Sequence, residues 1–163
     1  MKKLSIIIPA YNEERSISQI LGKIHQTRLI GETEKEILII DDGSKDSTAE
    51  KCRQFMQAHP DLDIHYHLQP FNQGKGAALR TGIALATGDW IIIQDADLEY
   101  DPEDYNPSIT VGDRKQCQSS LWFPFPETFE QTFLPAFLFR REISHFCHES
   151  LIRPTSDRRT DLL

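Results

Sequence analysis

The sequence predicts an α/β fold with an open, mainly parallel, Rossmann-like sheet. Three short apolar runs have the length and β-branched content of buried strands, and a fourth run alternates in polarity. Segments with helical periodicity or high alanine content lie between these runs. Strict alternation of strands and helices favours parallel strands that are joined by right-handed crossovers.

The first two strands and the first two helices are expected in the N-terminal third of the chain. Residues 4–8 and 36–40 are apolar runs that predict buried strands. Asn12 is placed to cap a helix that ends near Gln26, since its side chain can accept a hydrogen bond from a free backbone amide. Residues 47–58 are expected to form the second helix.

The next three elements continue the alternation. Residues 63–68 alternate in polarity, which favours a strand nearer the edge of the sheet. Residues 75–87 are rich in alanine and predict a helix that Gly88 closes. The apolar run 90–94 then predicts a fourth strand, buried like the first two.

The composition limits the class of protein. The chain of 163 residues has the length of one domain, with 39% hydrophobic and 26% charged residues, as in ordinary globular proteins. Its net charge of −7 argues against a nucleic-acid partner bound through a basic surface. No apolar run reaches the roughly 20 residues of a membrane-spanning helix, and the three scattered cysteines form no disulfide framework. We therefore expect a cytoplasmic protein without a transmembrane segment.

The character of the chain changes after Tyr105. Residues 1–105 hold seven of the eight glycines and two of the nine phenylalanines, whereas residues 106–163 hold the other glycine and seven phenylalanines. The whole net negative charge lies in the first part, which has 18 acidic and 11 basic side chains. We expect residues 1–105 to form a ligand-binding half-domain, and residues 106–163 to form an aberrant, non-native tail that packs poorly.

Polar or glycine-rich residues follow each predicted strand. These segments are 9–13, 41–44, 72–76 and 95–97. Parallel strands end at one edge of the sheet, where open α/β sheets bind ligands. Asp, Asn and Gly are also common in turns and caps, so each segment alone has an ordinary structural explanation. Their coincidence at one edge favours a binding site.

Asp95 and Asp97 are the strongest candidates for a metal site. They follow an apolar strand with one residue between them, so both carboxylates are expected to point to the same side of the strand end. Oxygen ligands favour Mg²⁺ or Mn²⁺, which in turn bind a diphosphate. Glu99 offers a further oxygen ligand. Lys75 begins a predicted helix, where a cation and free backbone amides favour binding of an anion. The glycines on either side of Lys75 match neither the P-loop motif nor the dinucleotide-binding fingerprint.

These segments, in this order and spacing, resemble the family 2 glycosyltransferases of the GT-A fold. The nearest branch is that of the dolichyl- or polyprenyl-phosphate sugar transferases, which includes the dolichyl-phosphate mannosyltransferase type. The resemblance covers residues 1–105 and implies the nucleotide-sugar-binding half of a GT-A domain. The matching motifs are I-I-P-A-Y-N-E from residue 7, I-D-D-G-S-K-D-S-T from residue 40, N-Q-G-K-G from residue 72 and D-A-D from residue 95.

The resemblance implies roles for individual residues. Asp95, Ala96 and Asp97 are expected to meet the ribose and the diphosphate, and Lys75 is a further expected donor-binding residue. Asp97 and Glu99 are the implied metal ligands, although the mannosyl branch usually has Gln in place of Glu99. The family's catalytic carboxylate is expected in a later segment that this sequence lacks, so the catalytic residue is not assigned. Five residues are expected to hold the nucleoside: Pro9, Tyr11, Glu13, Ile40 and Asp42.

The resemblance also implies an activity. It predicts a metal-dependent enzyme that moves a sugar from a donor of the GDP-mannose or UDP-glucose type to a polyprenyl or dolichyl phosphate at the cytoplasmic face of a membrane. The alternative is a donor-binding remnant without transfer activity, because the acceptor half is missing. A Rossmann-like regulatory module is a third alternative, which no nucleotide fingerprint supports.

Codon arithmetic indicates an origin for residues 106–163. The family continues with a G-S-R-F-like strand end and a T-D-x-x-[ST]-C-Y-K-like segment, and neither occurs here. Codons can be chosen for residues 121–126 so that reading from the second base, with the neighbouring bases, gives V-C-G-S-R-F-P. At the same offset, residues 156–163 can give L-T-D-E-P-T-C. Codon degeneracy permits many peptides, but both of these fit the family. We therefore expect a frame-shifted translation of an ordinary family member.

The gene sequence tests the frame shift. The DNA that encodes residues 106–163 is expected to spell both motifs when it is read from the second base of each codon. Sequencing genomic DNA around and beyond the codons for Tyr105 and Asn106 provides the measurement. A second frame without these motifs would contradict the prediction.

Overall fold

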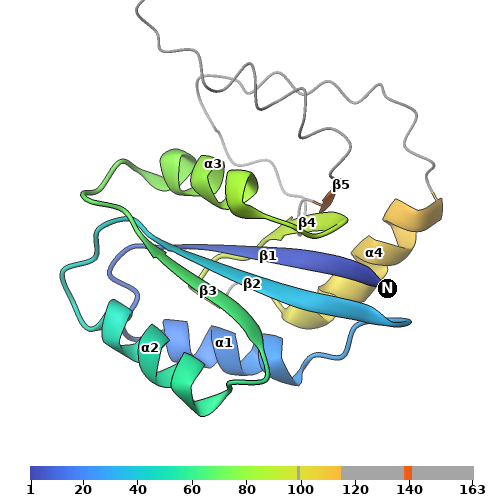
Figure 1. Ribbon diagram of the computed structural model, residues 1–163, viewed down its shortest axis with the longest axis horizontal. Helices are drawn as coiled ribbons and strands as arrows, with labels where there is room; N and C mark the ends of the chain where they lie inside the picture. The colour runs from blue at the N-terminus through green and yellow to red at the C-terminus, as the bar shows by residue number, and fades with distance from the viewer. Residues whose placement is uncertain (99, 115–137, 141–163) are drawn as a thin grey trace, which may run out of the picture.

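The structure is a computed structural model that describes residues 1–98, 100–114 and 138–140. These residues form one five-stranded sheet with helices on both faces, which confirms the α/β fold (Figure 1). Among them, no helix combines the length and apolar character that crossing a membrane requires. The elements in order are β1 (Lys2–Ala10), α1 (Ile17–Gln26), β2 (Thr33–Asp41), α2 (Thr48–Ala58), β3 (Asp63–Leu68), α3 (Lys75–Leu85), β4 (Trp90–Ile93), η1 (Pro102–Asp104), α4 (Tyr105–Arg114) and β5 (Leu138–Arg140).

The strand order β3-β2-β1-β4-β5 places β1 at the centre of the sheet. β1 pairs in parallel with β2 and β4, whereas β5 joins β4 in the antiparallel direction. Ala10 lies opposite Asp41 where β1 and β2 end, and Ile7 lies opposite Ile93 where β4 ends. Since α3 carries the chain from β3 back across to β4, the strand order reverses beside β1. Sheets of this type bind ligands at that point.

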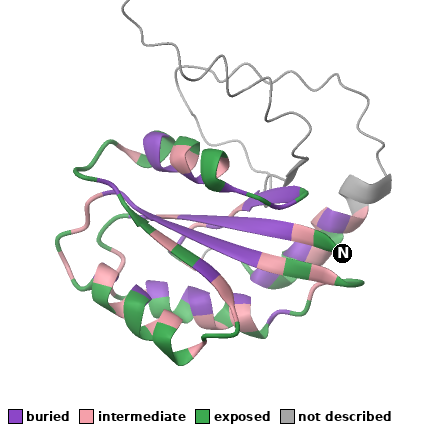
Figure 2. Cartoon of the chain, viewed as in Figure 1, coloured by how far each residue is buried: buried purple, intermediate pink, exposed green. Residues whose placement is uncertain are grey.

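Each face of the sheet has its own apolar core (Figure 2). Ile6 and Ile39 face α1, α2 and α4, whereas Ile7 and Ile40 lie under α3. The central strands are therefore buried from both sides, which explains their continuous apolar sequences. Gly82 of α3 permits close packing on this sheet, because a Cβ there would collide with the Ile7 side chain.

Helix α1 begins later than expected. Asn12 does not cap it, because this residue adopts a left-handed backbone conformation with φ of 57°. The Asn12 amide donates to Ser44 Oγ at 2.9 Å, and its side-chain oxygen accepts from the Lys45 amide at 2.9 Å. The helix instead starts at Ile17. Contacts with the segment after β2 thus override the local capping tendency of asparagine.

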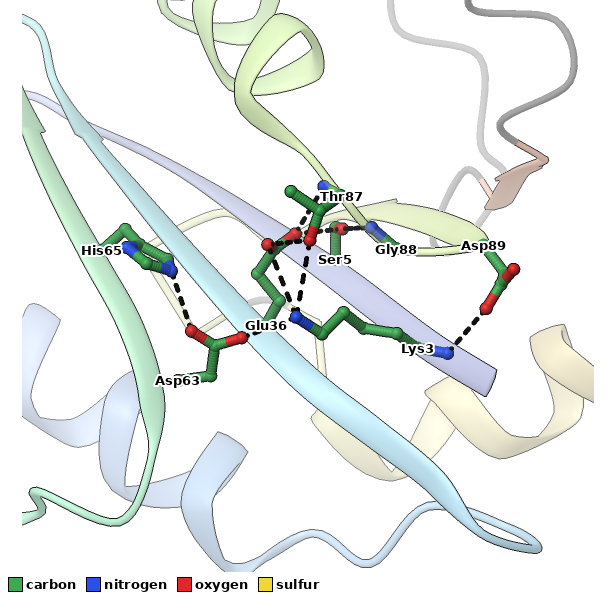
Figure 3. Close-up of polar contacts among 8 residues, drawn as sticks. All are labelled: Lys3, Ser5, Glu36, Asp63, His65, Thr87, Gly88 and Asp89. Carbon is green, nitrogen blue, oxygen red and sulfur yellow. Dashed lines mark hydrogen bonds and ion pairs between the residues drawn. The ribbon is translucent and has the colours of Figure 1, made fainter. Parts of the chain in front are cut away.

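A buried carboxylate joins β1 and β2 to the segment before β4 (Figure 3). Glu36 accepts short hydrogen bonds from the hydroxyls of Ser5 and Thr87, and the Thr87 amide donates to it at 2.8 Å. The Gly88 amide donates to Ser5 Oγ at 2.8 Å, and Lys3 Nζ lies 3.9 Å from the carboxylate. This network holds together three segments that are distant in the sequence.

Gly88 has a different role from the expected one. Helix α3 ends at Leu85, so Gly88 does not close it. A Cβ at Gly88 would lie 2.6 Å from Ser5 Oγ and 2.7 Å from the Lys3 carbonyl oxygen. Glycine is therefore needed here because β1 approaches the backbone closely.

Helix α4 contributes to the core at residue 105 and beyond it. Tyr105 and Ile109 are both 1% exposed and pack in the same cluster as α1. The Asn106 side chain accepts from the Ile30 amide at 2.9 Å and donates to the Arg28 carbonyl oxygen at 2.8 Å. The described packing therefore continues to at least Ile109, while most of the expected tail lies outside the described residues.

The Glu36 network predicts a pH-dependent contribution to stability. Burial opposes ionisation of Glu36, but hydrogen bonds from Ser5 and Thr87 and the charge of Lys3 outweigh it and hold the carboxyl pKa below its usual value. The ionised Glu36 carboxylate therefore contributes fully to the free energy of unfolding above its pKa in the unfolded chain, near 4.5. This contribution is lost as the pH falls through the lower pKa of Glu36 in the folded protein.

Glu36→Gln is expected to lower the free energy of unfolding by about 1–3 kcal/mol at neutral pH, because an amide donor would face the donors around it. The difference from wild type should shrink below a pH of about 4.5. Urea unfolding at several pH values measures it. Glu32→Gln, an exposed control just before β2, should change stability by less than about 0.5 kcal/mol. Equal losses in both variants would contradict the prediction.

Candidate functional site

A cleft of about 280 Å³ lies at the sheet edge where β1, β2 and β4 end. Its walls come from the end of β1, from the segments after β1, β2 and β4, and from α3 with the segment that precedes it. Residues from four separate parts of the sequence thus meet at the reversal of strand order. Eight of the predicted site residues line this cleft: Pro9, Tyr11, Glu13, Asp42, Lys75, Asp95, Ala96 and Asp97.

Among the predicted site residues that the structure describes, Ile40 does not line the cleft. Ile40 is 0% exposed, and its side chain packs with Leu38 and Ala78 between β2 and α3. Its visible role is to support α3, whose first turns form a wall of the cleft. Glu99 lies outside the described residues.

Asp42 connects the end of β2 to the segment that precedes α3. The residue is only 2% exposed, and its carboxylate accepts from the amides of Gln73 at 2.8 Å and Gly74 at 2.7 Å. The Asp42 amide in turn donates to the Ala10 carbonyl oxygen at 2.9 Å. Gly74 has a φ of 86°, which favours glycine. Asp42 therefore fixes the direction in which α3 begins.

Lys75 and Asp95 form an ion pair in the cleft. Lys75 Nζ lies 2.7 Å from Asp95 Oδ1, and the two side chains are 56% and 24% exposed. Lys75 is the first residue of α3, and Asp95 follows β4, so the ion pair joins two separate segments of the lining.

Asp95, Ala96 and Asp97 do not lie on an extended strand end. β4 stops at Ile93, and the three residues lie beyond it in a turn, with Asp95 partly buried and Asp97 exposed. The buried Gln94 orients this turn: its amide nitrogen donates to the Asp95 carbonyl oxygen at 3.0 Å, and its oxygen accepts from the Tyr105 hydroxyl at 2.7 Å. Both carboxylates nevertheless reach the cleft.

Tyr11 and Glu13 contribute the segment after β1. Tyr11 is 42% exposed at the cleft, so its ring offers a flat surface to a ligand. The Glu13 amide donates to Thr48 Oγ1 at 2.8 Å, and its carboxylate accepts from the Ser16 hydroxyl at 2.6 Å. These bonds position the segment against α2 and the start of α1.

The side chains of the cleft suit a hard divalent cation. Asp95 and Asp97 supply carboxylate oxygens from one turn, and such oxygens favour Mg²⁺ or Mn²⁺. The Asp95 side chain is 24% exposed and its ion-pair partner is the half-exposed side chain of Lys75, so a cation can reach its oxygens. The donor set thus fits the predicted metal.

A second group of possible metal ligands lies away from the cleft. Ligand atoms of Glu36, Asp63 and His65 are within 4.8 Å of one another. Lys3 Nζ already lies 2.8 Å from Asp63 and 3.9 Å from Glu36 (Figure 3). The lysine supplies the positive charge that these carboxylates need, so an ion-pair network explains the group without a metal.

Four residues line the cleft although the sequence analysis assigned them no role. They are small or neutral: Ala10, Asn72, Gly74 and Ala78. Asn72 and Gly74 belong to the N-Q-G-K-G motif, which was a signal for this part of the wall. The sequence does not identify Ala78 as a lining residue, because alanine is an ordinary helix-forming residue.

Comparison with known proteins decides the family. The model of Glycosyl transferase family 2 matches residues 5–132, which is most of the chain. The chain belongs to this family. The match extends past residue 105, and the boundary and frame shift proposed there stay predictions.

Individual relatives of this family 2 glycosyltransferase support the assignment. The undecaprenyl-phosphate 4-deoxy-4-formamido-L-arabinose transferase of Proteus mirabilis (strain HI4320) is 31% identical over 131 residues. The match covers 76% of this chain and 40% of that relative, so the chain spans well under half of its length.

Solved structures confirm the GT-A fold class. The mannosyltransferase PcManGT from Pyrobaculum calidifontis, in complex with GDP-Man and Mn²⁺, is 28% identical, with a TM-score of 0.55. That match covers 63% of this chain and 30% of PcManGT. S. aureus TarS 1–349 in complex with UDP, at 24% identity, shows the same fold with a TM-score of 0.58 over 69% of this chain and 32% of TarS.

The role of Asp42 predicts the effect of a conservative substitution. Asp42→Asn places an amide group against the Gln73 and Gly74 amides, where only an acceptor fits. We expect the free energy of unfolding to fall by about 1–3 kcal/mol and these two amides to exchange hydrogen faster. Urea unfolding and hydrogen exchange measure both effects. Asp61→Asn, an exposed control before β3, should change neither. Unchanged exchange at Gly74 in Asp42→Asn would overturn this role.

Proposed function

We propose that this chain binds a nucleotide-diphosphate sugar in the cleft with a divalent cation, and transfers the sugar to a polyprenyl or dolichyl phosphate. The observation that carries the proposal is the meeting of eight predicted site residues in one cleft at the reversal of strand order. Membership of glycosyl transferase family 2 supports a nucleotide-sugar donor. PcManGT, whose structure contains GDP-Man and Mn²⁺, supports the combination of donor and metal.

The proposed orientation of the donor follows from the chemistry of the cleft walls. The segment of Pro9, Tyr11 and Glu13 beside Asp42 supplies a ring and polar groups for the nucleoside. Asp95, Ala96 and Asp97 would contact the ribose and the diphosphate, and Lys75 would pair with a phosphate oxygen. Asp97 would hold the cation, with the neighbouring Asp95 carboxylate and Glu99 as further proposed ligands. A cation bound there would neutralise charge on the leaving diphosphate.

The transfer step requires little help from a protein base. A phosphate oxygen of the acceptor attacks the anomeric carbon of the sugar. The bond from that carbon to the diphosphate breaks, and the nucleoside diphosphate leaves with the electron pair. A phosphate acceptor is already ionised at neutral pH, so no proton has to be removed before attack.

The relative from Proteus mirabilis supports a lipid-phosphate acceptor, because its name specifies undecaprenyl phosphate. Such an acceptor has its phosphate at the membrane surface, so we propose that the chain acts at the cytoplasmic face of a membrane. GDP-mannose and UDP-glucose are the donor types to test first.

Donor binding without transfer is the alternative function. It would follow if residues 106–163 replace the family's acceptor side, as the codon arithmetic predicts. A transfer assay with radiolabelled GDP-mannose and UDP-glucose, and polyprenyl phosphate in vesicles, distinguishes the two. Labelled lipid supports the enzyme, whereas bound donor without labelled lipid supports the alternative.

Nucleotide binding is expected to depend on the metal. Without a cation, the carboxylates of Asp95 and Asp97 repel a diphosphate, so GDP or UDP should bind weakly in chelator and more tightly with Mg²⁺ or Mn²⁺. Asp97→Ala should abolish this dependence. Calorimetric titration with each nucleotide provides the measurement.

A matched variant separates the metal effect from the loss of one charge. Asp61→Ala removes an exposed carboxylate from the α2–β3 connection and should keep the metal dependence of the wild type. Equal nucleotide affinity of the wild type with and without chelator would rule out the proposed metal role.

A further inference from the structure

The ion pair between Lys75 and Asp95 occupies a carboxylate of the proposed metal site. Lys75 Nζ lies 2.7 Å from Asp95 Oδ1, a contact that also satisfies the distance of a charge-assisted hydrogen bond. Because one Asp95 oxygen already holds an ammonium group, a divalent cation that approaches it meets both a competitor for the oxygen and a repelling charge.

The charges around the cleft make Lys75 distinctive. Among the described residues that line the cleft, Lys75 is the only cation, against the four carboxylates of Glu13, Asp42, Asp95 and Asp97. The two oxygens of Asp42 accept backbone amides, and Glu13 accepts the Ser16 hydroxyl. Asp95 instead has the half-exposed side chain of Lys75 as its positively charged partner.

The backbone of Lys75 is held in place, whereas its side chain is half-exposed. The Gly74 amide donates to Asp42 at 2.7 Å, so the start of α3 has a fixed position at the cleft. The Lys75 side chain is 56% exposed, and ion pairs with this exposure contribute little free energy. The ammonium group can therefore leave Asp95 at small cost when a stronger anion arrives.

We infer that Lys75 is a resident counter-cation of Asp95 that excludes a free divalent cation and moves to the diphosphate when metal and nucleotide enter together. The inference rests on the proposed function and extends it by giving the order of binding. A diphosphate carries more negative charge than one carboxylate, and the positive end of α3 favours it as well. Departure of the ammonium group then frees Asp95 for the cation. Metal alone is bound weakly, and the metal–nucleotide chelate is bound well.

Mn²⁺ titration followed by electron paramagnetic resonance tests this order, because the signal of free Mn²⁺ is lost on binding. Lys75→Met should bind Mn²⁺ alone more tightly than the wild type, by about fivefold, since it removes the competing charge. The factor by which GDP or UDP tightens Mn²⁺ binding should fall in the same variant. Lys75→Arg keeps the charge and should bind Mn²⁺ alone as weakly as the wild type.

Lys45→Met is the matched control. Lys45 is an exposed lysine in the β2–α2 connection, so this variant changes the net charge equally without touching the ion pair. The inference is overturned if Lys75→Met binds Mn²⁺ alone no tighter than the wild type, if Lys45→Met gains as much, or if no variant binds Mn²⁺. The Mn²⁺-alone titration needs no nucleotide. Failure of GDP and UDP to bind would therefore contradict the proposed function, while the role of Lys75 is still decided.

Discussion

The parallel pairing of β1 with both β2 and β4 is the constraint on which the rest of the structure depends. Parallel strands need crossover connections, so the segment after each strand begins at the same edge of the sheet. Helices α1, α2 and α4 lie on one face and α3 on the other, so the segments after β1 and β2 diverge from the segment that leads into α3 (Figure 1). The cleft is the space between those segments, and the topology creates it before any side chain is considered.

Buried polar side chains convert this space into a site of defined shape. Asp42 holds the segment before α3 through two backbone amides, and Gln94 holds the turn after β4. Both side chains are almost fully buried, and both form hydrogen bonds with other groups of the protein. They support the positions of Lys75 and Asp97, whose side chains are exposed. A rigid interior thus positions groups that can respond to a ligand.

Carboxylates have opposite roles at the two ends of the sheet. Glu36 lies in the amino-terminal half of β2, where hydroxyl and amide donors of the chain surround it and Lys3 balances its charge. Asp95 lies beyond the carboxyl end of β4, with a half-exposed lysine as its ion-pair partner. The same chemical group is therefore structural where the protein supplies all its donors, and open to ligands where the partner is exchangeable.

Local sequence patterns determined the order of strands and helices through residue 94, and the four strand-end segments that form the cleft, because apolar periodicity reports burial directly. Tertiary contacts decided the remainder. Asn12 does not cap α1, because it is hydrogen-bonded to the segment after β2. Gly88 does not end α3, but allows β1 to lie close to the backbone before β4. The Lys75–Asp95 ion pair and the Glu36 network were also invisible in the sequence, because their partners lie far apart along the chain and meet only when the sheet has formed.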